Sequence, residues 1–329
     1  MKKKVIMLWG IIIIVIILGA GCTDKMQDKK CIIITSMNSL HNGDAKLYRN
    51  QIITSVEGKF TVYDKKGEMV KQFPDIAANW IDCMDEEGII VYGNGACQIG
   101  ILQVDDEWNV VKNETVMQTD NLQIDPTIIK VKDIYYMTVT EIVGTVNNAD
   151  PSAENGEYIL HLYKSADISH WDLVSNIVDV NNNIEDVDMR YIDDRFFITY
   201  EKEVVDKGDS AIYVAISDDA SGKFFSTSHQ LLEANCDHEP AIFKQMDNSV
   251  YRLYYSCDKN HKGESYQGAQ VFYSDFDSNW NPISIDNSVE TQTEQGILLY
   301  DVKNVKGNLQ LLYARNYLTD CDMVVEEVK

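Results

Sequence analysis

The stretch HEPAIFKQMDNSVYRLYYS at His238–Ser256 places an acidic residue before an apolar strand, a polar turn and an aromatic-rich strand. The same order occurs twice before it, as IDPTIIKVKDIYYMTVT at Ile124–Thr140 and as EDVDMRYIDDRFFITY at Glu185–Tyr200. One β unit of this kind cannot bury both of its faces alone, so repeated units pack side by side. The repeat therefore predicts an all-β fold, a β-propeller, in which equivalent strands of successive blades surround one axis.

An acidic residue occupies the same place in each copy of this repeat. Aligned on the second strand, Asp125, Asp186 and Glu239 are 61 and 53 residues apart. Equivalent positions of a radial array face one axis, so the three carboxylates are expected to form a site. A two-sheet sandwich is the alternative fold, but it does not predict equivalent acids.

Strand-forming residues fill most of the chain, in short runs rich in Ile, Val, Tyr, Phe and Thr that end at clusters of Asp, Asn, Gly and Lys. Helices should therefore be rare. Strand pairs are expected near residues 44–73, 78–112, 122–178, 183–232, 236–288 and 294–328. Five blades are expected, with the first unit contributing strands to closure, and six blades are the alternative.

The N-terminus has the features of a bacterial lipoprotein signal. Three lysines precede an apolar run from Val5 to Leu18, and small residues precede Cys22. We expect a signal peptide over residues 1–21, lipidation at Cys22, a polar tether over residues 22–30 and a propeller domain over residues 31–329. The protein would then be extracytoplasmic and lipid-anchored to the cell membrane. An uncleaved N-terminal membrane anchor is the alternative.

Six further cysteines follow Cys22, and an extracytoplasmic location permits disulfides between them. Cys236 and Cys257 flank the hairpin that contains Glu239, so they should lie together at its open end. The apolar runs that begin at Cys31 and Cys321 could pair and close the ring of blades. The spacings do not resemble a zinc site, and no metal ligands are predicted; unpaired buried cysteines are the alternative to disulfides.

The acidic balance excludes some partners. The formal net charge is −23, and it falls to −26 when the three lysines of the signal are removed. Such a surface repels nucleic acid and anionic lipid headgroups, so membrane contact should occur through the lipid anchor only. A neutral or cationic ligand fits better, and we expect a monomer.

The repeated phrases resemble the five-bladed β-propeller glycosidases, above all glycoside hydrolase family 43 and more weakly families 32, 117 and 130. The resemblance covers about residues 120–285 and implies hydrolysis of arabinosides and xylosides with inversion. It implies that Asp125 is the general base, Asp186 the residue that modulates pKa values, and Glu239 the general acid. Val187 departs from the proline usual after the second acid. The run from Glu185 to Arg190 also resembles the mannoside phosphorylases, more weakly.

Elementary chemistry supports the same assignment. Inverting cleavage needs a protonated carboxylic acid at the leaving oxygen and a carboxylate across the ring to activate water. Asp186, near Glu239, would raise the pKa of that acid by like-charge repulsion. The expected partner is a carbohydrate and no cofactor is required, although a carboxylate cluster could hold a structural calcium ion. The alternative is a non-catalytic propeller lipoprotein that binds glycan or protein.

Five further residues are candidates for substrate binding. Asp188 shares a strand face with Asp186, and Tyr300 and Asp301 occupy the equivalent position of the last unit. Arg315, on the following strand, could bind sugar hydroxyls. His238 precedes Glu239, but in a regular strand it would point away from the axis. Trp80 and Trp108 could stack on a sugar, although core packing is the commoner role.

Overall fold

A computed structural model describes residues 44–55, 59–144, 156–180, 183–204, 208–217, 227–246, 249–262, 266–293, 295–305, 307–317 and 321–328, together with strand 31–34. The predicted signal peptide, Cys22 and the tether lie outside these residues. Within the described ranges, no helix has the length and apolar character needed to span a membrane.

All regular elements of the described ranges are β-strands, and three of their sheets contain four consecutive strands each. One sheet contains β9 (Leu122–Val131), β10 (Ile134–Val143), β11 (Glu157–Ser165) and β12 (Asp172–Val180). The next contains β13 (Ile184–Ile192), β14 (Arg195–Val204), β15 (Asp209–Ser217) and β16 (Thr227–Leu232). The third contains β17 (Glu239–Gln245), β18 (Tyr251–Cys257), β19 (Gln270–Phe276) and β20 (Pro282–Ser288).

The N-terminal part of the chain forms a longer sheet of seven strands. They are β2 (Ala45–Tyr48), β3 (Gln51–Thr54), β4 (Lys59–Tyr63), β5 (Met69–Met84), β6 (Ile89–Asn94), β7 (Gln98–Val104) and β8 (Val110–Gln118). The first half of β5 pairs with β4 and its second half pairs with β6. One continuous strand is thus the outer strand of one unit and the inner strand of the next.

The last sheet joins the two ends of the domain. It contains β21 (Ile297–Val305), β22 (Asn308–Arg315), β23 (Asp322–Val328) and β1 (Cys31–Ile34). β1 pairs with β23 in antiparallel register, with Ile32 opposite Val325. The predicted pairing of the two terminal apolar runs is therefore confirmed. Cys321 is a free thiol in this structure, so this closure depends on main-chain hydrogen bonds.

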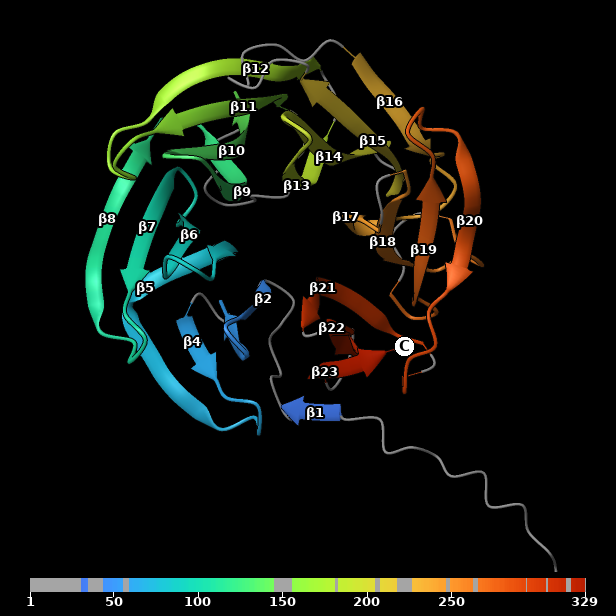
Figure 1. Ribbon diagram of the computed structural model, residues 1–329, viewed down its shortest axis with the longest axis horizontal. Coiled ribbons are helices and arrows are strands. Elements are labelled where there is room, and N and C mark those ends of the chain that lie inside the picture. The colour runs from blue at the N-terminus through green and yellow to red at the C-terminus, as the bar shows by residue number, and fades with distance from the viewer. Residues whose placement is uncertain are drawn as a thin grey trace, which may run out of the picture.

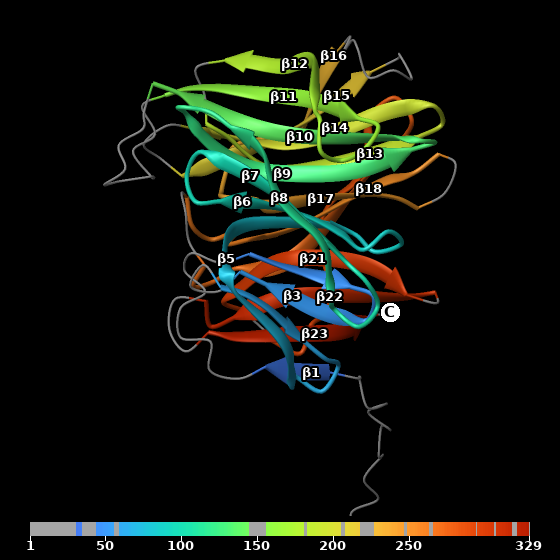
Figure 2. The same cartoon turned by 90° about the vertical axis from the view of Figure 1, so that its left-hand side faces the viewer.

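The sheets stand around a central axis, as Figure 1 shows in face view and Figure 2 from the side. Among the described residues, β2, β5, β9, β13, β17 and β21 contact one another in turn and complete the inner ring. The all-β fold and the radial arrangement agree with the expected propeller. Hydrogen bonding gives five sheets, whereas six strands form the inner ring, so the blade number depends on which is counted.

Irregular pairing occurs on the inner strands at the repeated acids. The register of β9 and β10 shifts between Thr138 and Thr140, opposite Asp125. Equivalent shifts occur where β13 pairs with β14 and where β17 pairs with β18. Asp125 and Asp186 adopt positive φ angles of 49° and 48°. Aspartate enters this left-handed region more readily than most residues. Bulges of this kind redirect side chains near functional sites, and here they mark the residues that line the axis.

Candidate active site

A cavity of about 670 Å³ opens on the axis between the inner strands. The three acids of the repeat, Asp125, Asp186 and Glu239, all line it. Four further carboxylates share the lining, namely Asp44, Asp82, Asp188 and Asp301. The cavity is therefore acidic, and its volume lies in the range of small-molecule sites.

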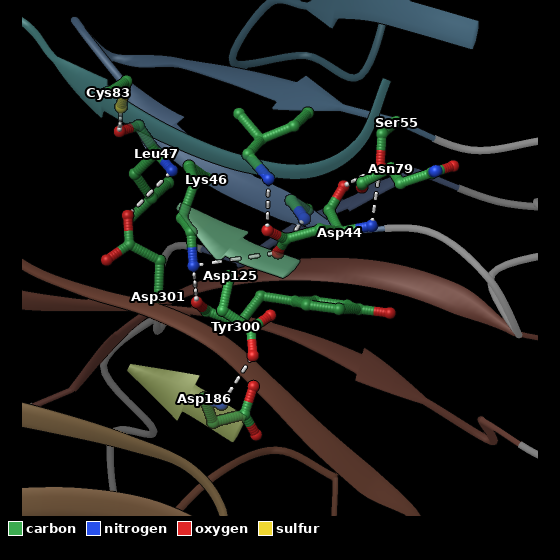
Figure 3. Close-up of polar contacts among 12 residues, drawn as sticks. Asp44, Lys46, Leu47, Ser55, Asn79, Cys83, Asp125, Asp186, Tyr300 and Asp301 are labelled. Atoms are coloured by element: carbon green, nitrogen blue, oxygen red, sulfur yellow. Dashed lines mark hydrogen bonds and ion pairs between the residues drawn. The ribbon is translucent and has the colours of Figure 1, made fainter. Parts of the chain in front are cut away.

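Asp125 and Asp186 lie next to each other, as Figure 3 shows. The backbone N–H of Asp186 donates to Asp125 Oδ2 at 2.9 Å. Burial, followed by the charge of Asp186, raises the pKa of the Asp125 carboxyl well above its usual value. Burial also raises the pKa of Asp186, to about 6, while the nearby Lys46 charge opposes that rise. The pair therefore binds a proton more readily than two exposed aspartates.

Glu239 is fixed by hydrogen bonds from the neighbouring sheet. The Tyr266 hydroxyl donates to Glu239 Oε2, and Ser256 Oγ donates to the Glu239 carbonyl oxygen at 2.6 Å. Burial raises the pKa of the Glu239 carboxyl well above its usual value, and the charges of Asp237 and Asp186 add to that rise. Burial is therefore the largest influence on this carboxyl, and the nearby negative charges act in the same direction.

Lys46, on the first inner strand β2, and Asp44, which immediately precedes this strand, were missed by the sequence reasoning. Lys46 Nζ lies 3.7 Å from Asp44 Oδ1 and donates to the Tyr300 carbonyl oxygen at 3.3 Å (Figure 3). Although burial opposes it, the negative charge of Asp44 raises the pKa of the Lys46 ammonium. An acid at the start of the first expected strand was the available signal, since the other units share it. No sequence signal marks Lys46.

Each of three remaining acids connects its own inner strand to the next sheet of the ring. Asp82 Oδ2 accepts from the Ile128 N–H at 2.8 Å, and Asp188 Oδ2 from the Phe243 N–H at 2.8 Å. Asp301 Oδ2 accepts from the Leu47 N–H at 2.9 Å. These carboxylates therefore have a structural role beside any contact with a ligand.

Asp188, Tyr300 and Asp301, three of the residues that the sequence marks as candidates for substrate binding, line the cavity. Tyr300 has a buried hydroxyl with no hydrogen-bond partner among the described residues. Arg190 also lines the cavity, but its Nη2 lies 2.9 Å from Asp188 Oδ1. The Nε of Arg190 donates to the carbonyl oxygen of Phe243. Its cation is therefore already neutralised.

Two predicted substrate-binding residues lie elsewhere. His238 is 1 % exposed, and its Nδ1 bonds to the Ser210 carbonyl oxygen at 2.8 Å, outside the cavity lining. Arg315 also lies outside this lining and pairs with Asp322 at 2.7 Å. The prediction that these two residues contact substrate is therefore not supported, because His238 bonds to Ser210 and Arg315 pairs with Asp322.

Aromatic side chains complete the cavity. Trp80 and Tyr317 line it, and the Tyr317 ring packs against Tyr266 with centroids 4.6 Å apart. Trp108, in contrast, is buried and its Nε1 donates to Gln51 at 2.9 Å. Of the two tryptophans considered from the sequence, Trp80 can therefore meet a ligand, and Trp108 belongs to the core.

A polar cavity at the centre of the propeller, lined by half-buried carboxyl groups, is compatible with glycosidase chemistry. Residues 116–294, more than half of the chain, match the sequence model of the family described as glycosyl hydrolases family 43. The chain belongs to this family, and it is a glycoside hydrolase.

Solved structures show a similar fold at low sequence identity. The endo-arabinase of Bacteroides thetaiotaomicron matches with a TM-score of 0.53 and 11% identity, covering 76% of this chain and 93% of that enzyme. An exo-1,5-α-L-arabinanase from a bovine ruminal metagenomic library has a TM-score of 0.49 and 12% identity, over 75% of this chain and 91% of that one. The likeness concerns the fold alone. Among curated proteins, none matches this sequence.

Proposed function

We propose that the protein is a surface-anchored hydrolase that cleaves poly- or oligosaccharides with inversion at the anomeric carbon. The observation that carries the proposal is the presence of Asp125, Asp186 and Glu239 on one cavity of about 670 Å³. Inverting hydrolysis requires a carboxylic acid and a carboxylate on opposite sides of the scissile bond. These are the groups that the cavity offers.

Glu239 is the proposed general acid. Burial favours its protonated form, and the Tyr266 hydroxyl donates to Oε2. The other carboxyl oxygen is then free to carry the proton. In the reaction that proton passes to the glycosidic oxygen as the bond to the anomeric carbon breaks.

Asp125 is the proposed general base, and Asp186 is the neighbouring carboxylate that sets its ionisation. The base must be ionised to take a proton from the attacking water. Lys46 favours the ionised form of both carboxylates, and the two titrate as a pair because they interact closely. Asp186 thereby modulates the pKa of the base.

The substrate proposed is a neutral glycan containing arabinose or xylose. Trp80 lines the cavity and offers an aromatic face for a sugar ring. Membership of glycosyl hydrolases family 43 supports this class. Arabinan, xylan and their oligosaccharides are therefore the first substrates to test.

The cell-surface location rests on the sequence. The apolar run after three lysines and the small residues before Cys22 support export, lipidation and membrane attachment through the lipid. Residues 22–30 would then separate the propeller from the membrane. Mass spectrometry of the membrane-extracted protein would show whether its first residue is a lipidated Cys22.

The decisive experiment separates the roles of acid and base. In Glu239→Gln, hydrolysis of a natural oligosaccharide should fall by 10²-fold or more, because general acid catalysis contributes that much. An aryl glycoside with a nitrophenolate leaving group needs no protonation, so its hydrolysis should fall far less. In Asp125→Asn, added azide should restore turnover and give a glycosyl azide of inverted configuration.

Glu141→Gln is the matched control, because Glu141 is also partly buried but bonds to His161 Nε2 at 2.8 Å, away from the cavity. It should retain the wild-type rate. Equal losses on both substrates in Glu239→Gln, or a first product of retained configuration by NMR, would contradict the proposed mechanism.

A further inference from the structure

A second cluster of reactive side chains lies behind Glu239, outside the cavity. Cys236, His238 and Cys257 are 1, 1 and 3 % exposed, and the three ligand atoms lie within 4.8 Å of one another. Both cysteines are free thiols. The sequence places them together at the open end of a hairpin, and the structure confirms that position.

The histidine ring is oriented with a lone pair toward the sulfurs. His238 Nδ1 lies 2.8 Å from the Ser210 carbonyl oxygen, which can only accept, so Nδ1 carries the hydrogen. In a neutral ring Nε2 is then the acceptor, and it lies 3.5 Å from Cys236 Sγ. A hydrogen bond from Nδ1 to a backbone carbonyl is the arrangement that fixes metal-binding histidines.

The spacing fits one tetrahedral metal ion. With Zn–S near 2.3 Å and Zn–N near 2.0–2.1 Å, the edge between a sulfur and a nitrogen ligand is about 3.5 Å. The contact between Cys236 and His238 has that length. We propose that Cys236, His238 and Cys257 bind Zn²⁺, a use of this cluster separate from the glycosidase site.

The charges around the cluster are compatible with such an ion. Two thiolates neutralise Zn²⁺. Lys259 is the cation that faces both sulfurs, and its Nζ is paired with Asp286 Oδ1 at 2.6 Å. Three protein ligands leave a fourth position of the tetrahedron for water or the nearby Asn235 amide oxygen, which lies 3.3 Å from Cys236 Sγ.

The location gives the metal a structural role. Cys257 is the last residue of β18, while Cys236 and His238 immediately precede β17. Glu239 begins β17 and pairs with Ser256. An ion that binds these three ligands would therefore tie the entry of β17 to the end of β18.

The test begins with the full chain, purified without chelator or reductant and analysed for zinc by elemental mass spectrometry. About one zinc per chain is expected in the wild type and in the control Cys321→Ser, a buried cysteine outside the cluster. Cys257→Ser should lose the zinc. In the Co²⁺-substituted protein, near-ultraviolet thiolate-to-cobalt absorption should be present in the control and reduced in Cys257→Ser.

A measurement on the wild type keeps the proposal testable if Cys257→Ser does not fold. Titration with a thiol-specific mercurial should release zinc in proportion to the thiols modified, and a chelator should lower the melting temperature. A Cys236–Cys257 disulfide, seen as a linked peptide two hydrogens lighter, would overturn the proposal. So would a zinc-free chain with two free thiols, or unchanged zinc in Cys257→Ser.

Discussion

At the residue scale, burial is the main influence on the ionisation of the three repeated acids of the cavity. It raises the pKa of Asp125, Asp186 and Glu239, and the mutual repulsion of the acids adds to the effect. Lys46 acts in the opposite direction on Asp186. The site can therefore hold protonated and ionised carboxyl groups together, as hydrolysis with inversion requires.

The acid limb of the pH profile follows from Asp186. Burial raises the pKa of Asp186 to about 6 and the pKa of Asp125 well above its usual value, so as the pH falls the pair should gain protons in a higher pH range than exposed aspartates do. The ratio kcat/KM should then decrease with falling pH. Lys46→Met removes a charge that lowers the pKa of Asp186, so the limb should move to higher pH. The exposed Lys164→Met is the control, and an unmoved limb in Lys46→Met would contradict the assignment.

Tyr266 is predicted to position the acid. Its hydroxyl donates to Glu239 Oε2, and a hydrogen bond to a charged or reacting group is worth about 1.5–3 kcal/mol. Tyr266→Phe keeps the ring contact with Tyr317 but removes this bond. We expect kcat to fall by about tenfold or more with little change in KM. The partly buried Tyr63→Phe, outside the cavity lining, should leave both constants unchanged.

At the element scale, the inner strands combine bulges with acids that bond the next sheet. Asp82, Asp188 and Asp301 each accept a main-chain N–H from the neighbouring sheet. The bulges at Asp125 and Asp186 direct other acids toward the axis. The same strands therefore hold the ring together and supply the site.

Asp82 shows the free-energy cost of this arrangement. Burial raises its pKa from 3.8 to about 6. A folded-state pKa above the unfolded value means that stability falls as the pH rises from about 4 to above 6, by at most about 3 kcal/mol for this group. Asp82→Asn cannot ionise and can still accept from Ile128. Urea unfolding should therefore show the variant gaining stability over wild type between pH 4 and pH 7. The exposed Asp133→Asn should show no such gain.

At the scale of the whole molecule, the two ends of the described domain meet in one sheet. β1 pairs with β23, so the ring is closed by main-chain hydrogen bonds between residues nearly 300 positions apart. An edge strand left without its partner exposes a row of unpaired N–H and C=O groups. Closure thus affects stability and aggregation together.

Removal of β1 should test this closure. A chain that begins at residue 36 lacks β1, whereas one that begins at residue 31 retains it and serves as the control. The shorter chain should melt at a lower temperature, by about 2 °C for each kcal/mol lost, and should aggregate more readily. Equal melting temperatures in calorimetry would show that β1 adds nothing to the closed ring.

The repeat of acid, strand, turn and strand was sufficient to predict the all-β fold and the equivalent positions of Asp125, Asp186 and Glu239 on inner strands. It did not predict that β5 continues across the expected boundary between residues 73 and 78. Period-two side-chain alternation and turn residues are local properties, so they can be read from neighbouring residues. His238 was predicted to point away from the axis for the same reason. The pairing of β1 with β23 was predictable because both runs are apolar and terminal.

Tertiary structure decided the features that depend on residues far apart in the chain. Lys46 meets Tyr300 across 254 positions, and Asp301 accepts from the Leu47 N–H across the same separation. No local pattern encodes such contacts, because ring closure brings the strands together. The pKa of each carboxyl was likewise undetermined by the sequence, since it depends on burial and on charges from other sheets. The sequence determined that Asp125, Asp186 and Glu239 occupy equivalent positions of the inner strands. The folded ring added Asp44 and Asp82 to their cavity, and it set the pKa values of these acids because burial and charges from other sheets act only there.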